Sequence, residues 1–224
     1  MTEAARTLWR LLLREIALAW AGGLATPLGF FLGATVLVPL AVGAERALLA
    51  RIGPPLLLVF AALAAIMTFE RLLQADLEDG SIDQWAISPW PLEGFAALKA
   101  LAALIAIGGP ITLASAPLAL AVQAPPASIP ILVLAIGLAL AAFYGFGLLG
   151  AALTAGVRRG GLLLALLVMP FMAPPLVFAA AAITASIAGE DPQAPLSLLG
   201  ACALLAWMLG PTGAGAALRA QLEE

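Results

Sequence analysis

Six carboxylates lie close together near the middle of this chain and are its main concentration of chemically active groups. They make up nearly half of its thirteen acidic residues: Glu70, Asp76, Glu78, Asp79, Asp83 and Glu93. Grouped carboxylates can bind divalent cations, exchange protons or meet a basic partner. The other groups that the chain offers decide among these roles.

Most kinds of catalysis lack a necessary residue here. The chain has no histidine, so a Ser–His dyad or triad is excluded. Its one lysine is Lys99, and no G-x-x-x-x-G-K-[ST] run occurs, so we expect no P-loop for ATP. The single cysteine, Cys202, lies in an apolar run and is expected to be a packing residue. We therefore expect a non-catalytic chain, and any ATP to bind a partner chain.

The run Asp76-x-x-Asp79-Gly80 could be compared with the start of the metal site in CDP-alcohol phosphotransferases. Such a site needs several carboxylates that converge on divalent ions inside a membrane helix. Here Asp83-Gln84 stands where Ala-Arg would follow the glycine, and no second aspartate pair follows at helical spacing. The sequence therefore predicts no metal site.

The composition places these acids in a membrane protein. Of 224 residues, 63% are hydrophobic and only 10% are charged, against about 25% charged residues in ordinary globular chains. A helix that crosses the bilayer needs about 20 apolar residues. Five charge-free stretches are long enough for one or more such helices: 16–44, 52–69, 100–157, 160–189 and 192–218. We predict an all-α integral membrane protein whose surroundings are lipid, with no nucleic-acid partner.

We predict one membrane domain, residues 1–224, with six spans. They cover about 24–44, 52–69, 98–122, 129–157, 162–188 and 196–218. Residues 3–20 are expected to form a helix on the membrane surface, since Arg6, Arg10 and Arg14 share one face and Trp9 lies among apolar residues. The alternative is that this segment is only the basic flank of the first span.

Proline, glycine and tryptophan add local expectations. The third span is expected to bend at Gly109 and Pro110, and the fifth to bend or break at Pro170, Pro174 and Pro175. Small residues in the fourth span predict close helix packing: Gly145, Gly147, Gly150 and Ala151. The tryptophans fall near predicted span ends, where such residues often sit at the lipid headgroups: Trp9, Trp20, Trp85, Trp90 and Trp207.

The basic residues predict the orientation. With the N-terminus inside, eight of the ten face the cytoplasm: Arg6, Arg10, Arg14, Arg71, Lys99, Arg158, Arg159 and Arg219. Only Arg46 and Arg51 face outward. Because cytoplasmic loops carry the excess of Lys and Arg, we expect both termini, the acidic segment and the turn at Arg158 to be cytoplasmic.

The acidic segment is predicted as a cytoplasmic loop over residues 70–97. Asp79-Gly80-Ser81 favours a turn, Ser81–Ile87 a short capped helix, and Ser88-Pro89-Trp90-Pro91 its end. Ile82, Trp85 and Ile87 would form its apolar side. From the residues alone, two interpretations stay open. The helix docks in a groove of a soluble partner, or the loop is solvated and its tryptophans rest at the lipid interface.

Two runs in this order resemble the CcmB family, also called cytochrome c maturation protein B or haem exporter protein B. The first run is Phe69-Glu-Arg, then Asp76-x-x-Asp79-Gly80-Ser81-Ile82-Asp83-Gln84, then Ser88-Pro89-x-Pro91-Leu92. The second is Arg158-Arg159-Gly160-Gly161 with the apolar stretch up to Pro170 and Pro174. Asp83 stands where Glu is expected and Trp85 where Leu is usual, which keeps the charge and the apolar character.

The resemblance implies a permease subunit of an ABC-type complex for cytochrome c maturation in the bacterial inner membrane. It implies a separate ATPase, CcmA, membrane partners CcmC and CcmD, the haem chaperone CcmE, and two copies of this chain. The residues implied to couple to the ATPase are Asp76, Asp79, Gly80, Ser81, Asp83, Gln84, Trp85, Ser88 and Pro89. The cytoplasmic turn implied beside them is Arg158, Arg159, Gly160 and Gly161.

Haem itself is expected to be handled by partner subunits. The usual axial ligands are His, Cys, Met and Tyr, and this chain has no His and one Tyr, Tyr144, within a span. One alternative is a permease that itself translocates haem or another hydrophobic substrate. The other is a stand-alone transporter of a small solute, for which the spans offer only scattered hydroxyls such as Thr112, Ser115, Thr154 and Thr184.

Overall fold

A computed structural model describes residues 3–43, 45–88, 90–155 and 160–222, and every regular element in them is helical. The α-helices are α1 (Glu3–Gly23), α2 (Ala25–Val42), α3 (Arg46–Phe69), α4 (Arg71–Glu78), α5 (Ser81–Ala86), α6 (Leu92–Ala103), α7 (Gly109–Ala121), α8 (Ile129–Thr154), α9 (Gly160–Ala188) and α10 (Gln193–Leu222). A π-helical turn, η1 (Leu104–Gly108), joins α6 to α7, and a 3-10 turn, η2 (Pro126–Ser128), precedes α8. The all-α prediction is confirmed.

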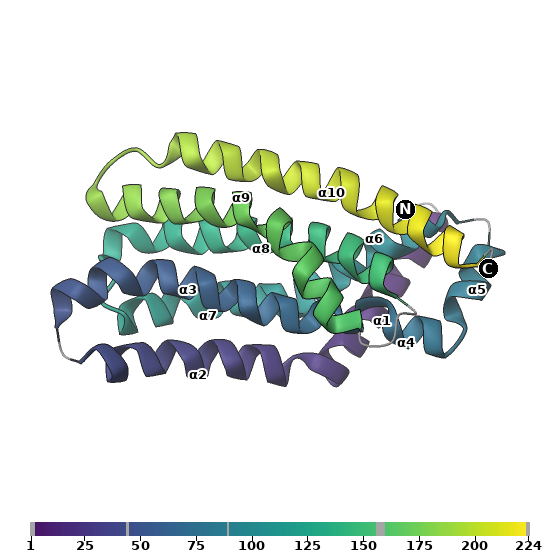
Figure 1. The fold of residues 1–224 in the computed structure, drawn as a ribbon, viewed down its shortest axis with the longest axis horizontal. Helices are drawn as coiled ribbons and strands as arrows, with labels where there is room; N and C mark the ends of the chain where they lie inside the picture. The colour runs from purple at the N-terminus through teal and green to yellow at the C-terminus, as the bar shows by residue number, and fades with distance from the viewer. Residues whose placement is uncertain (1–2, 44, 89, 156–159, 223–224) are drawn as a thin grey trace.

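Within the described residues, six helical segments are long and apolar enough to cross a membrane, as predicted. They are Ala25–Val42, Arg46–Glu78, Leu92–Ala121, Pro126–Thr154, Gly160–Ala188 and Gln193–Leu222. They lie side by side as one bundle (Figure 1). Both ends of the chain gather at one end of the bundle together with α4 and α5, and the connection between α9 and α10 lies at the other. The two ends of the described chain and the acidic segment thus lie at one end of the bundle, and that this end faces the cytoplasm stays a prediction.

The segment 70–97 is mostly helical, which corrects the prediction of a long loop. Helix α3 ends at Phe69, and α4 begins after the single residue Glu70. Helix α6 already begins at Leu92, six residues before the predicted start of the third span, because Pro91 is its N-cap residue and has an extended, non-helical backbone. The bundle therefore continues almost without a break into the acidic segment.

Helix α8 lies at the centre of the bundle and packs against α3, α7, α9 and α10. Its glycines allow this: a Cβ on Gly147 would meet the ring of Phe69, and one on Gly150 would meet the Val168 side chain. Tyr144 of α8 is fully buried, lies edge-on to Phe69 and places its hydroxyl 3.1 Å from Thr68 Oγ1. The predicted close packing of the fourth span is confirmed.

One tryptophan does not lie where the sequence predicted. Trp207 stands well inside α10, and its indole N–H donates a hydrogen bond of 2.9 Å to the carbonyl of Ala141 in α8. The expectation that Trp207 sits at the lipid headgroups is therefore wrong. The indole of Trp85 stacks on Phe95 of α6. Trp9 and Trp20 of α1 are more than half exposed, at 55% and 57%.

Candidate functional site

The acidic segment turns between α4 and α5 through a local Asp-Gly-Ser unit. Gly80 has φ +74°, which favours glycine, and the Ser81 N–H donates a hydrogen bond of 2.9 Å to Asp79 Oδ1. The Ser81 side chain and then its backbone N–H hold the pKa of the Asp79 carboxyl below its usual range. The predicted turn and short helix are therefore present, and α5 runs from Ser81 to Ala86.

The inner face of α5 is bound to the membrane bundle. Ile82 is 2% exposed. The Trp85 ring stacks on Phe95 with centroids 4.7 Å apart. After the helix, Ser88 Oγ donates to the Trp85 carbonyl at 2.8 Å and accepts from the Trp90 N–H at 3.3 Å. The aromatic stack fixes α5 to α6, which argues against a freely solvated loop.

The outer face of α4 and α5 is acidic and exposed. Its exposed polar residues are Arg71 at the start of α4 and then Gln74, Glu78, Asp79, Asp83 and Gln84, and the exposed Ile87 follows α5. We call the six residues after Arg71 the acidic face. Ile87, which was predicted to join Ile82 and Trp85 on the inner side, is instead 89% exposed. This correction puts one large apolar side chain among carboxylates on a surface that faces away from the membrane helices.

Behind the acidic face lies a charged cluster that the sequence reasoning missed. Lys99 Nζ of α6 lies 2.7 Å from Glu15 Oε2 of α1 and 2.7 Å from Asp76 Oδ2 of α4. The side chains of Lys99, Glu15 and Asp76 are only 13%, 9% and 11% exposed. We call these three residues the charged triad. It joins the N-terminal helix, the acidic segment and the third span at one lysine.

Two further contacts tie the triad to its surroundings. Lys99 Nζ also lies 5.6 Å from the centroid of the Phe95 ring, the same ring on which Trp85 stacks. Arg14 Nη1 stands 3.7 Å from Glu15 Oε1, with the Arg14 side chain 69% exposed. The triad and the aromatic stack therefore share Phe95, so α5 is connected to Lys99 through one side chain.

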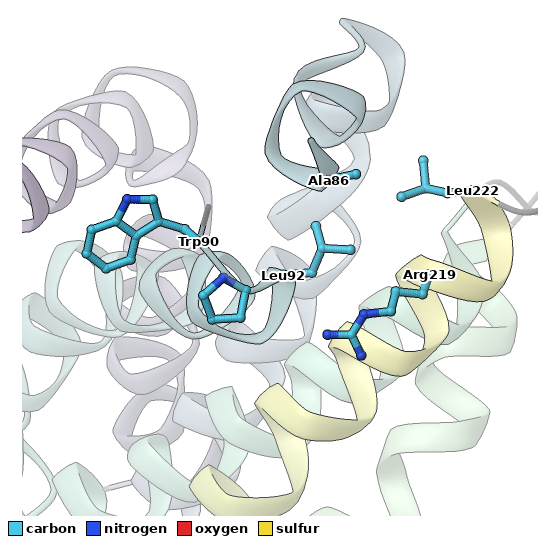
Figure 2. A pocket seen from close by; sticks show the side chains of 6 residues that line it. Ala86, Trp90, Leu92, Arg219 and Leu222 are labelled. Carbon is cyan, nitrogen blue, oxygen red and sulfur yellow. The ribbon is translucent and has the colours of Figure 1, made fainter. Parts of the chain in front are cut away.

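A second ion pair joins the ends of α6 and α10. Arg219 Nη2 lies 2.5 Å from Glu93 Oε1, and Gly215 of α10 packs directly on the Glu93 side chain. Gln221 donates through Nε2 to the carbonyls of Ala152 and Ala155. Beside this pair is a shallow pocket lined by Ala86, Trp90, Pro91, Leu92, Arg219 and Leu222. In Figure 2, Arg219 reaches from α10 toward the start of α6 beside Leu92.

Part of the predicted cytoplasmic turn lies outside the described residues, namely Arg158 and Arg159, as does Pro89 of the coupling segment. Gly160 begins α9. Gly161 lies so close to α3 that a Cβ there would meet the carboxylate of Glu70 within 2.6 Å. The two runs that suggested the family therefore meet in space, at Glu70 and Gly161.

The third and fifth spans are not interrupted at their prolines, and the hinge role of these residues stays a prediction. The third span passes through the π-turn η1 immediately before Gly109 and Pro110, and such single-turn π-helical irregularities often mark functional sites. Helix α9 is continuous over Pro170, Pro174 and Pro175, and it changes direction along its length (Figure 1). A helix keeps its remaining hydrogen bonds around a proline, so the chain bends there without ending.

Comparison with known proteins gives one consistent result. Residues 6–221 match the family model described as CcmB protein. The chain is 42% identical over 214 residues to Heme exporter protein B of Paracoccus denitrificans, covering 95% of this chain and 98% of that protein. It is 40% identical to the protein of the same name from Pseudomonas aeruginosa, with 90% of each chain covered. It is 35% identical to that of Escherichia coli K12, with 96% and 99% covered.

Proposed function

This chain belongs to the CcmB family, and we propose that it is the membrane permease subunit of an ABC-type haem exporter for cytochrome c maturation. In this role it converts ATP hydrolysis on a separate CcmA-type ATPase into movement of its spans in the bacterial inner membrane. The movement delivers haem to, or releases, a haem-loaded CcmE-type chaperone. CcmC-type and CcmD-type subunits and a second copy of this chain complete the assembly.

The acidic face is the observation that carries this proposal. A surface of carboxylates around Ile87, 89% exposed, suits a basic partner with one apolar pocket, because complementary charge steers association and an apolar anchor holds it. Its inner side is fixed to α6 by the stack of Trp85 on Phe95. A push on α5 is therefore passed to the membrane helices and not absorbed in a loose loop.

Haem is handled by the partner subunits in this proposal. The side chain of Tyr144 is exposed to neither lipid nor water, because it is fully buried and its hydroxyl faces Thr68. Binding iron there would require Tyr144 to leave that contact and the bundle to open. A haem titration of the purified chain tests this point, and stoichiometric binding with a defined axial ligand would contradict it.

The stand-alone transporter is disfavoured by the hydroxyls of the spans. Coupled transporters place polar groups on a shared path near the membrane centre. Here Thr112, Thr154 and Thr184 each donate to the carbonyl four residues earlier in their own helices, at 2.8 Å. The one hydroxyl proton of each is used within its own helix, so none of the three is free to donate to a solute in this arrangement.

The test is co-purification of a CcmA-type ATPase with three forms of the chain. The first is wild type, and the second is Asp79→Asn with Asp83→Asn on the acidic face. The third neutralises a matched pair at the other end of the bundle, Glu190→Gln with Asp191→Asn. Asp191 is a close match for Asp79, because its carboxylate also accepts a backbone N–H two residues on, from Gln193 at 2.9 Å.

We expect the wild type and the Glu190, Asp191 variant to recover the ATPase equally. The Asp79, Asp83 variant should recover about tenfold less, since two charges that steer the encounter are gone. Equal recovery by all three would remove the acidic face as the docking surface. No recovery even by the wild type would contradict the ABC assignment itself.

A further inference from the structure

The charged triad has a composition that packing alone does not explain. One ammonium, Lys99 Nζ, lies 2.7 Å from each of two carboxylates, those of Glu15 and Asp76. Buried ion pairs add little net stability compared with apolar residues of similar size, because both charges must leave water. Their better-supported use is to fix how elements are arranged. Stability is therefore a poor reason for a lysine to stand between these acids.

The three residues belong to elements with different neighbours. Asp76 is on α4, which connects directly to α5 through the Gly80 turn. Glu15 is on α1, which packs against α6 and the π-turn η1. Lys99 is on α6, one turn before η1. A displacement of Asp76 thus reaches both the N-terminal helix and the irregular turn of the third span through one side chain.

We propose that Lys99 is a positioning residue that transmits movement of the α4–α5 segment to α1 and to the third span by holding Asp76 and Glu15 together. This inference rests on the proposed function, because the movement begins when an ATPase presses on the acidic face. Lys99 touches neither ATP nor haem. Its role is to keep three helices moving as one unit.

The chemistry of lysine suits a residue that links two carboxylates on different helices. Its ammonium has three donors at the end of a flexible four-carbon chain, so it can follow one carboxylate while it keeps the other. When Asp76 moves, the ammonium moves with it and draws Glu15 along, because breaking either pair would leave a nearly buried carboxylate without its cation. An apolar contact in the same place would let the helices slip past each other, because dispersion and the hydrophobic effect are not directional.

The experiment measures the movement of α5 and of α1 with spin labels, in the complex of this chain with a CcmA-type ATPase. One label is placed by Ala86→Cys at the end of α5, outside the acidic face, and the other by Arg10→Cys on α1, both exposed positions. The only native cysteine is removed by Cys202→Ala. The distance of each label from a fixed site on the outer loop, Glu190→Cys, is measured in separate samples with and without ATP.

Three forms of Lys99 are compared. Lys99→Met keeps the length of the side chain and removes the charge. Lys99→Arg keeps the charge and serves as the conservative rescue. A charge exchange, Lys99→Glu with Asp76→Lys, restores one cation between two carboxylates and guards against the chance that Lys99→Met simply fails to fold.

We expect ATP to shift both labels in the wild type and in the Lys99→Arg and exchanged forms. In Lys99→Met the ATPase should still bind and the α5 label still shift, while the α1 label loses most of its shift. An unchanged shift of the α1 label in Lys99→Met would overturn the proposal, as would its loss in the exchanged form with the ATPase bound. If the α5 label fails to respond in wild type with the ATPase bound, the proposed function fails first.

Discussion

Gly145 of α8 and Gly210 of α10 lie so close that a Cβ on Gly210 would collide with the Gly145 backbone, carbonyl oxygen first. A Cβ on Gly145 would in turn meet the backbone of Ala206 within 2.8 Å. Because neither helix backbone can give way as a flexible side chain can, the two glycines set the distance between the central span and the last one.

This contact predicts that Gly210→Ala destabilises the protein, by about 1–3 kcal/mol, as overpacking does in dense interiors. The matched control is Gly200→Ala in the same helix, where a Cβ meets nothing within 4 Å. That substitution should be neutral or gain up to about 1 kcal/mol from helix propensity. Unfolding in detergent measures both, and a Gly210→Ala variant as stable as Gly200→Ala would contradict the contact.

The stack of Trp85 on Phe95 predicts separate effects for Trp85 of α5 and for Ile87, which follows that helix. Trp85→Ala should lower stability by about 1–3 kcal/mol, since it removes a partly buried ring and an aromatic pair. Ile87→Ala should leave stability unchanged, because Ile87 is 89% exposed, and should lower recovery of the ATPase. Thermal unfolding and co-purification, run on both variants, separate the inner from the outer face. Equal stability losses would show that the two faces are wrongly assigned.

The lowered pKa of Asp79 predicts a pH dependence for the turn. A carboxyl whose pKa falls on folding stabilises the fold above its unfolded pKa and loses that contribution as pH falls through its folded pKa. Wild type should therefore be more stable than Asp79→Ala at neutral pH, and the difference should shrink to nothing in acid. Unfolding midpoints of the two proteins from neutral to acidic pH measure it. A difference that grows as pH falls would have the wrong sign.

The two ion pairs at this end of the bundle should differ in strength. Arg219 and Glu93 have side chains 51% and 27% exposed, so a double-mutant cycle with Arg219→Met and Glu93→Gln should give a coupling of about 1 kcal/mol or less. Lys99→Met leaves two nearly buried carboxylates without their cation, and should cost about 3 kcal/mol or more. Denaturant titrations give both values. A larger loss for Arg219→Met than for Lys99→Met would reverse the ranking.

The π-turn η1 and Pro110 predict a hinge in the third span. Pro110→Ala returns a backbone N–H beside η1, which should favour a regular helix and leave stability equal or higher. ATP turnover by the complex should fall, because a straighter helix bends less readily. Pro117→Ala, in the same helix and away from η1, is the control and should keep full turnover. Full turnover in both variants would argue against the hinge.

The elements that depend on neighbours in the chain were predictable from the sequence. A span must supply enough consecutive apolar residues to cross the bilayer and must satisfy its own backbone hydrogen bonds, so the apolar stretches of the sequence predicted six spans. The turn at Asp79, Gly80 and Ser81 forms from a side chain that bonds two residues on, and it too was predicted correctly. Both follow from interactions within a few residues.

The contacts that give the candidate site its meaning depend on how the helices pack. Lys99 and Asp76 both appeared in the sequence as cytoplasmic charges, but nothing in their spacing from Glu15 indicated that the three would meet. In the sequence, Trp85 was as suited to contact lipid or a partner protein as to stack on Phe95. Ile87 was expected on the same apolar side as Trp85. The packing of α1 and α4 against α6 decided these pairings. That packing depends on contacts between distant parts of the chain, which the order of residues does not display.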